Sequence, residues 1–158
     1  MITVNISNKG CISVFLLLVM LLVMLPVRAE AAQIVETEIE YLPDGGYIET
    51  VVTESVSRAS GTKTGTKVKR QVDADGNEQW AIQLQGTFSY NGTSASCTNA
   101  VCNVTVSASN WYVVSKAAGK SGAVATADVT MGRKVLGITV AKNQYALTLT
   151  CDKNGNLS

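Results

Sequence analysis

Alternation of apolar and polar side chains constrains the fold of this chain more than any other feature. The clearest apolar row is Trp80, Ile82, Leu84, Gly86, Phe88 and Tyr90, and the residues between its members are mostly polar. Successive side chains of a strand point to opposite faces, so this row predicts a half-buried β-strand. The same period of two recurs in residues 34–41, 47–56, 123–131 and 145–151, and no segment after residue 31 shows a convincing helical period.

Turn signals separate the alternating segments. They are the stretches 42–46, 73–77, 91–92, 120–122 and 154–155, which are rich in Gly, Asn and Asp. Seven to nine short strands between such turns are typical of a sandwich or barrel. We therefore expect an all-β immunoglobulin-like β-sandwich, with a jelly roll or a small barrel as the alternatives.

The register of one hairpin follows from its turn. Asn91-Gly92 predicts a two-residue turn, which would place Phe88 opposite Ala95 and Gly86 opposite Cys97. Cys97 then points into the core. Beyond residue 99 the alternation changes parity, which predicts a β-bulge or a change of sheet. Residues 132–137 are expected to form a connection or a kink.

The N-terminus has the pattern of a secretory signal peptide. Residues 10–27 carry no charge, Lys9 precedes them and Pro26 lies near their end. Ala29 and Ala31 then provide the small residues of a cleavage site. We expect a signal peptide over residues 1–31, cleavage after Ala31, and a secreted or extracellular product without a stable membrane span. An uncleaved anchor is the alternative.

Charge is segregated along the remaining chain. Residues 32–57 carry a net charge of −6 and residues 58–158 a net charge of +6. We interpret the first part as an acidic β-hairpin and the second as the sandwich body. The acidic segment is expected either to dock on the basic body or on a second copy, in a salt-sensitive way, or to form a separate solvated face. The balanced total excludes the basic excess of a nucleic-acid binder.

Three cysteines remain outside the leader: Cys97, Cys102 and Cys151. Pairing is expected in an oxidising compartment. Cys97 and Cys151 both occupy inward positions of long strands, consistent with a disulfide across the core. Cys102 is left as a free or intermolecular thiol, and its pairing with either of the others, or its burial as a small apolar residue, are the alternatives.

The residue types exclude several kinds of chemistry. The chain has no histidine, which removes His-based triads, Cys–His pairs and His-containing zinc sites. Asp73, Asp75 and Asn77 have the opening spacing of a calcium loop, but Glu78 and Leu84 stand where that loop needs Gly and Glu. We expect no metal, no cofactor and no enzymatic activity. Trp111 and Tyr112 straddle two faces of a strand, so one of them is a candidate aromatic for ligand binding.

Three runs carry a resemblance. They are the residues 86–97 (GTFSYNGTSASC), 120–123 (KSGA) and 149–158 (LTCDKNGNLS). The chain resembles an uncharacterised family of small exported proteins of Gram-positive bacteria, chiefly Clostridia. The resemblance implies the bacterial cell envelope or the medium as destination. It also supports pairing Cys97 with Cys151, whereas Cys102 lies outside the matching runs.

The sequence therefore predicts a secreted or envelope-associated, non-catalytic β-domain with a binding or structural role. Its expected partner is a cell-wall or surface glycan or a protein. An exported effector, bacteriocin-like or toxin-like, is the first alternative. A glycan-active enzyme that uses carboxylates alone is the second.

Overall fold

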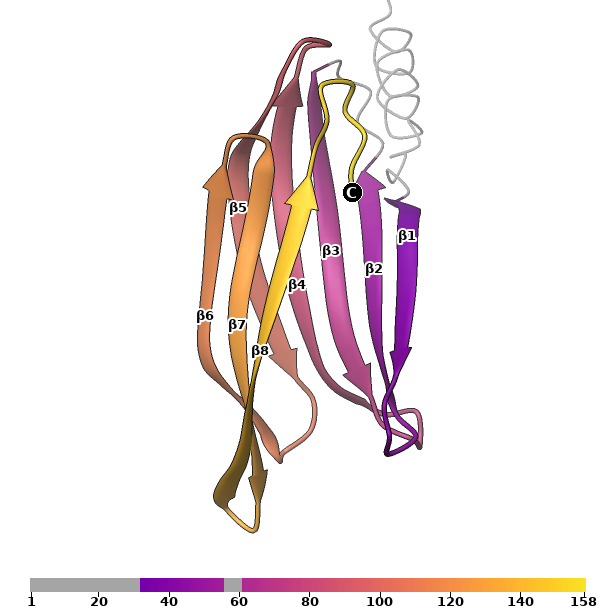
Figure 1. Ribbon diagram of the computed structural model, residues 1–158, viewed down its shortest axis with the longest axis vertical. Coiled ribbons are helices and arrows are strands. Elements are labelled where there is room, and N and C mark those ends of the chain that lie inside the picture. Colours follow the sequence, from indigo (N-terminus) through magenta and orange to yellow (C-terminus); the bar gives the residue numbers. More distant parts are fainter. Residues whose placement is uncertain (1–31, 56–60) are drawn as a thin grey trace, which may run out of the picture.

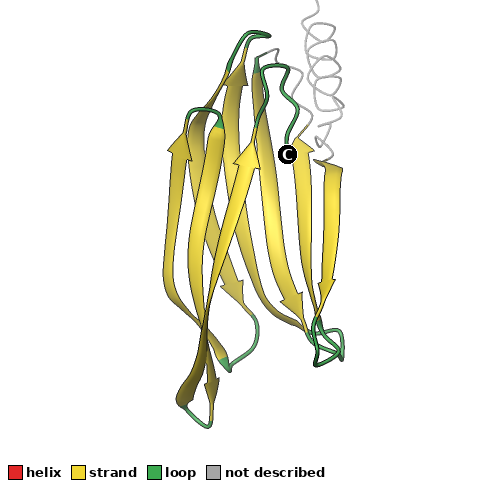
Figure 2. Ribbon diagram, in the orientation of Figure 1, coloured by secondary structure: helices red, strands yellow, loops and turns green. Residues whose placement is uncertain are grey.

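The computed structural model describes residues 32–55 and 61–158, and within them it contains eight antiparallel strands and no helix (Figures 1 and 2). The strands are β1 (Ala32–Tyr41), β2 (Tyr47–Ser55), β3 (Thr62–Val72), β4 (Glu78–Tyr90), β5 (Ala95–Val106), β6 (Trp111–Ser121), β7 (Val124–Val135) and β8 (Ile138–Thr150). The expectation of an all-β sandwich of seven to nine strands is confirmed. The predicted signal peptide lies outside the described residues. In the described part, no helix is long and apolar enough to cross a membrane.

The strands form two sheets in chain order. One sheet has the order β1-β2-β3-β4-β5 and the other the order β6-β7-β8, so the chain passes between sheets once, at residues 107–110. The three-stranded sheet packs on β3, β4 and β5 and leaves β1 beyond its edge (Figure 1). Neighbouring strands within each sheet are consecutive in the chain, which explains why turn residues recur so regularly in the sequence.

The core lies between the two sheets. It contains Val52, Trp80, Ile82, Leu84, Phe88, Cys97, Trp111, Ala125, Ala127, Val129, Met131, Leu147, Leu149, Cys151 and Leu157. The predicted inward rows of β4, β7 and β8 are confirmed, since their members are buried apart from Tyr90, Ala123 and Tyr145, which are half-buried. Trp80 lies at the centre against Trp111 and Tyr145, at ring-centroid distances of 6.1 and 4.6 Å. Its indole Nε1 donates a hydrogen bond to Gln71 Oε1 at 3.0 Å, so this buried polar atom is satisfied.

The β4–β5 turn differs from the two-residue turn that the sequence predicts. The side-chain oxygen of Asn91 accepts hydrogen bonds from the backbone N–H groups of Thr93 (3.0 Å) and Ser94 (2.9 Å), which closes a four-residue turn. Phe88 consequently pairs with Cys97, and the predicted pairing was wrong by two positions. A shift of two keeps the parity, so Cys97 still faces the core. The predicted bulge is confirmed in β5, where Thr98 is the extra residue opposite Thr87–Phe88. It moves the partner of Gly86 to Ala100, three positions from the predicted Cys97.

Residues 132–137 were expected to be a connection or a kink, and this is right in part: most of them continue a strand, but that strand has a register shift and ends in a turn within these residues. β7 runs to Val135, with a register shift between Arg133 and Lys134, and only Leu136 and Gly137 form the turn into β8. The apolar run on both sides of the turn lets the ladder extend to its last pair, Val135 with Ile138.

The acidic hairpin is part of the larger sheet. β2 pairs with β3 along its length, and Glu49 and Glu54 form ion pairs with Arg70 (2.6 Å) and Lys63 (2.9 Å). β1 is exposed on both faces, so the expectation that residues 34–41 are half-buried was wrong. The physical reason is the width of the second sheet, which does not extend over β1 (Figure 1).

Candidate functional site

Four exposed apolar side chains gather at the β7–β8 hairpin. We call residues 133–142 the β7–β8 tip. Leu136 is 97% exposed, Ile138 71%, Val140 57% and Val135 49%. Figure 1 shows the tip extending past the other loops at the same end of the sandwich. A protruding cluster of this kind is typical of an interaction site, because a soluble protein otherwise shields such side chains.

The backbone at the apex is strained in a way that polar turn residues would avoid. Leu136 has a φ of 50° and Gly137 a φ of 81°. Two consecutive positive φ angles define the type I′ turn, which favours Asn-Gly. Leu136 is the one non-glycine residue with a positive φ in the part of the chain that the structure describes. The conformation costs a leucine about 1–2 kcal/mol. An apolar residue therefore occupies a position where the left-handed backbone conformation and the exposure to solvent both favour asparagine.

Cationic side chains surround the base of the tip. Arg133, Lys134 and Lys142 lie in or beside the apolar run, and residues 129–151 contain no Asp or Glu. Lys134 Nζ lies 4.6 Å from the ring centroid of Tyr112, and the Arg133 guanidinium lies 5.9 Å from that of Trp111. The site thus combines an aliphatic apex with three cationic residues toward its base.

The two candidate binding aromatics have separate positions. Trp111 is 7% exposed and belongs to the core. Tyr112 is half-buried, its hydroxyl hydrogen-bonds Thr139 Oγ1 at 2.8 Å, and its ring lies on Gly132, where a Cβ would approach the ring to 2.3 Å. Of the two, Tyr112 alone reaches the surface, and it connects β6 to the base of the β7–β8 tip.

The three cysteines are free thiols in this structure, so the expected Cys97–Cys151 disulfide is not formed in it. Two of the sulfurs instead donate to a nearby carbonyl of their own segment: Cys97 Sγ to Asn99 O at 3.2 Å and Cys151 Sγ to Asp152 O at 3.5 Å. Both cysteines also donate their backbone N–H groups to one turn, at Gly122 O (2.7 Å) and Ala123 O (3.0 Å).

Burial raises the pKa of all three thiols above its ordinary value. For Cys102, the nearby charge of Lys116 acts in the opposite direction. Cys102 is half-buried on β5 and packs against the core, opposite Leu84. Its position is therefore that of a small apolar residue at the margin of the core.

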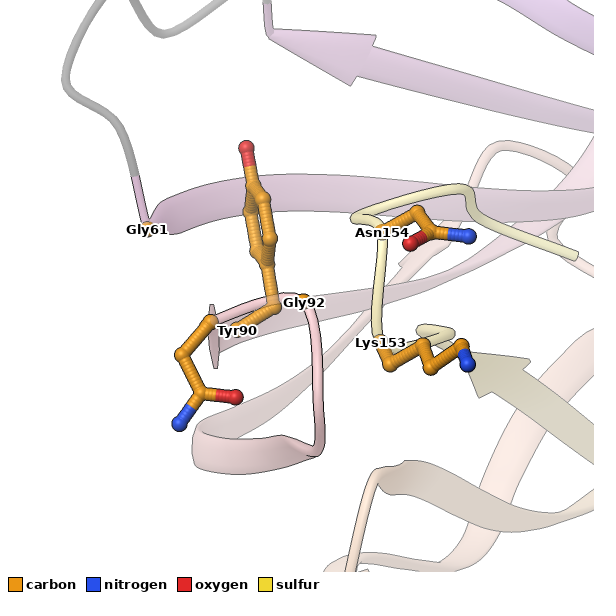
Figure 3. Close-up of a pocket in the computed structure, with 6 residues that line it drawn as sticks. Gly61, Tyr90, Gly92, Lys153 and Asn154 are labelled. Atoms are coloured by element: carbon orange, nitrogen blue, oxygen red, sulfur yellow. The ribbon is translucent and has the colours of Figure 1, made fainter.

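A hollow of about 540 Å³ lies at the opposite end of the sandwich, lined by Gly61, Tyr90, Asn91, Gly92, Lys153 and Asn154. Figure 3 shows the ring of Tyr90 standing there while the side chains of Lys153 and Asn154 point away from it. Gly155 lies on that ring, where a Cβ would come within 2.5 Å. The hollow does not gather polar groups toward one point, as a ligand site would.

Carboxylates that lie close to one another accept hydrogen bonds from the backbone of a turn or pair with an arginine. Glu49 and Glu78 both contact Arg70, at 2.6 and 3.9 Å. The Asp73 carboxylate accepts N–H bonds from Asp75 (3.0 Å) and Asn77 (2.8 Å), and hydrogen bonding to Asn77 lowers its pKa. The first carboxylate of the calcium-loop spacing, that of Asp73, is thus used by the turn itself. Within residues 32–55 and 61–158, no group of three or more His, Cys, Asp or Glu side chains is placed to hold a metal ion.

Comparison with known protein families, with curated proteins and with solved structures finds no match. The site therefore rests on the chain's own geometry. The sequence did contain a signal for it, the run VLGITV between Arg133-Lys134 and Lys142. Sequence reasoning missed the site because a Gly at each end of residues 132–137 favoured a connection.

Proposed function

We propose that this chain is an exported, non-catalytic β-sandwich of a Gram-positive bacterium that attaches to the cell envelope through its β7–β8 tip. The signal peptide over residues 1–31 would be removed after Ala31, and the product would be secreted and retained at the envelope. The single observation that carries the proposal is the exposed aliphatic apex around Leu136, held in a strained turn above three cations.

Burial of the apex supplies a driving force of the right order. Fully burying a Val, Leu or Ile side chain is worth about 1.5–3 kcal/mol. The exposed fractions of the four apolar tip residues therefore correspond to roughly 4–8 kcal/mol before the costs of association. This range supports reversible attachment rather than permanent anchorage.

Export would also expose the thiols to an oxidising compartment. We propose that Cys97 and Cys151 form a disulfide in the oxidising compartment and that Cys102 remains free. What supports this pairing is their common attachment to the turn at residues 122–123. The two side chains are also close enough that the charge of a Cys97 thiolate contributes to raising the pKa of Cys151. Peptide mapping of the exported chain by mass spectrometry tests it: a linked Cys97–Cys151 peptide is expected, and a peptide linked through Cys102 would contradict it.

An exported effector is the second candidate, because an apolar, cationic tip is also suited to disturbing a neighbouring cell's membrane. Growth inhibition of Gram-positive cells by the purified chain separates the two functions. Attachment without inhibition is expected of an envelope-bound module.

Co-sedimentation with Gram-positive cell envelopes tests the main proposal. Residues 32–158, which contain both sheets, are compared with the variants Leu136→Asn and Ile34→Asn. Asn fits a left-handed turn, so the first variant removes the apolar apex without disturbing the fold. Ile34 is a matched control, since it is an exposed aliphatic residue on β1. We expect the control to sediment like the unmodified chain and Leu136→Asn to remain in the supernatant. Equal sedimentation of both variants would overturn the proposal.

A further inference from the structure

We infer that the envelope component bound by the β7–β8 tip is the surface of an anionic lipid bilayer, into which the apex inserts. This inference rests on the proposed attachment function and names its ligand class.

The dimensions of the tip match shallow insertion. The apolar pair Val135 and Ile138 flanks the turn, and Lys134 pairs with Thr139 one step further back. At about 3.3 Å per residue, Lys134 and Arg133 lie roughly 7–10 Å from the apex, and Lys142, which pairs with Gly132, lies roughly 13–17 Å from it. Side chains that lie in a bilayer interface penetrate about 5–10 Å, to the boundary between headgroups and acyl chains. Leu136 would then reach that boundary while the cations stay at the headgroups.

The side chains favour lipid over a glycan. Sugar rings are recognised by exposed aromatic faces and converging polar groups, and the tip offers neither. Tyr112 is engaged by Thr139 and covered by Lys134, and Trp111 is buried in the core. The exposed groups are aliphatic and stand on a convex protrusion, a shape that fits a deformable bilayer interface better than a preformed pocket.

Backbone hydrogen bonding limits the depth. The two strands of the tip pair with each other. The outer edge of β7 is paired only as far as Arg133, opposite Trp111, and Lys134, whose N–H donates to Asn110 O at 2.7 Å; beyond these two, no described residue pairs with the outer edges of the tip. Unpaired backbone groups are not tolerated in the hydrocarbon core, which excludes spanning but allows a hydrated interface. The tip is therefore a surface anchor.

The charge pattern selects an anionic surface. Arg133, Lys134 and Lys142 are not balanced by any acidic residue between positions 129 and 151. Long cationic side chains near an interface extend toward the headgroups and leave their aliphatic stems in the apolar layer. Attraction between exposed charges weakens as salt shortens the screening length, so binding must fall with ionic strength.

Vesicle sedimentation with residues 32–158 tests the inference. The probes are vesicles of phosphatidylcholine mixed with phosphatidylglycerol and vesicles of phosphatidylcholine alone. We expect binding to the mixed vesicles that decreases with salt, and at least about tenfold weaker binding for Leu136→Asn and for the double variant Lys134→Gln/Lys142→Gln. Lys153→Gln, an exposed lysine at the opposite end, is the matched charge control and is expected to bind normally.

A second measurement reports insertion itself. Leu136→Trp places an indole at the apex, while native Trp80 and Trp111 are buried. We expect a blue shift of emission on adding mixed vesicles and quenching by brominated lipid.

The outcomes separate this inference from the proposed function. Sedimentation with envelopes but not with either vesicle would overturn the lipid inference and leave attachment to a wall glycan or protein. Failure to sediment with envelopes and with vesicles would overturn the lipid inference and the proposed attachment function together. Equal vesicle binding by Leu136→Asn and the unmodified chain would place the contact elsewhere and overturn the inference.

Discussion

Leu136 combines a backbone conformation that favours asparagine with a side chain that favours burial. Its φ of 50° is costly for leucine, and its side chain is 97% exposed. Replacing it by asparagine should therefore stabilise the free protein by about 1 kcal/mol. Urea unfolding measures this change. Ile138→Asn is the control, because Ile138 has no positive φ to relieve, and an equal gain in both variants would show that strain is not the cause.

Thiol reactivity is the second test at this scale. The thiolate is the reactive form, and burial raises the pKa of Cys97, Cys102 and Cys151. In the folded, reduced protein, alkylation at pH 8 should be slower than in denaturant and should accelerate as pH rises. Because Cys102 is half-buried and the other two are buried, Cys102 should react first. Mass spectrometry after timed alkylation gives the order, and faster labelling of Cys97 or Cys151 would contradict it.

At the scale of single elements, the C-terminal loop depends on one carboxylate. Asp152 accepts N–H bonds from Asn154 and Asn156, both at 2.8 Å, and the side-chain amide of Asn156 donates at 2.7 Å. These bonds lower the pKa of Asp152, with the Asn156 side chain the largest cause. The loop returns Leu157 to the core beside Gly65.

A carboxylate with a lowered folded pKa stabilises the fold above its unfolded pKa, and this stability is lost as pH falls through the folded value. Asp152→Ala should therefore lower the urea midpoint at pH 7. As the pH falls below about 4, the stability of this variant should decline less than that of the unmodified protein. Asp75→Ala is the control, since the Asp75 side chain accepts none of the hydrogen bonds of its turn. A pH profile for Asp152→Ala parallel to that of the control would contradict the prediction.

The elements differ in how far the sequence could predict them. The inward rows of β4, β7 and β8 follow from alternation alone because these strands are central or face the other sheet. The β4–β5 turn was mispredicted because the Asn91 side chain, rather than the backbone pattern, sets its length. The exposed face of β1 could not be predicted, since it depends on the width of the second sheet. The β7–β8 tip was missed because alternation does not show where a hairpin extends beyond the body of the sandwich.

At the scale of the whole molecule, the segregated charges meet within one sheet. Ion pairs join β2 to β3, but their side chains retain 17–41% exposure. Pairs of this kind contribute no more than about 1 kcal/mol each. The backbone ladder and the buried side chains of β2 must therefore hold the acidic hairpin, and we expect its docking to depend little on salt. This differs from the salt-sensitive docking that charge alone suggests.

Two deletions measure which part of the acidic hairpin the fold requires. Every residue of β1 is exposed, whereas Val52 and Ile48 of β2 are buried. Removing residues 32–41 should lower the melting temperature by only a few degrees. Removing residues 32–60 should cost about 3–6 kcal/mol in lost burial of those two side chains.

Loss of β2 would remove a large part of the stability of a typical domain, which is about 5–15 kcal/mol. The longer deletion should therefore be unfolded or melt at least roughly 10 °C lower, with the edge of β3 open to aggregation. Circular dichroism melts across a salt series compare both deletions with residues 32–158. Equal melting of the two deletions would show that the body folds without the acidic hairpin. A steep salt dependence of the intact chain would instead assign its docking to the ion pairs.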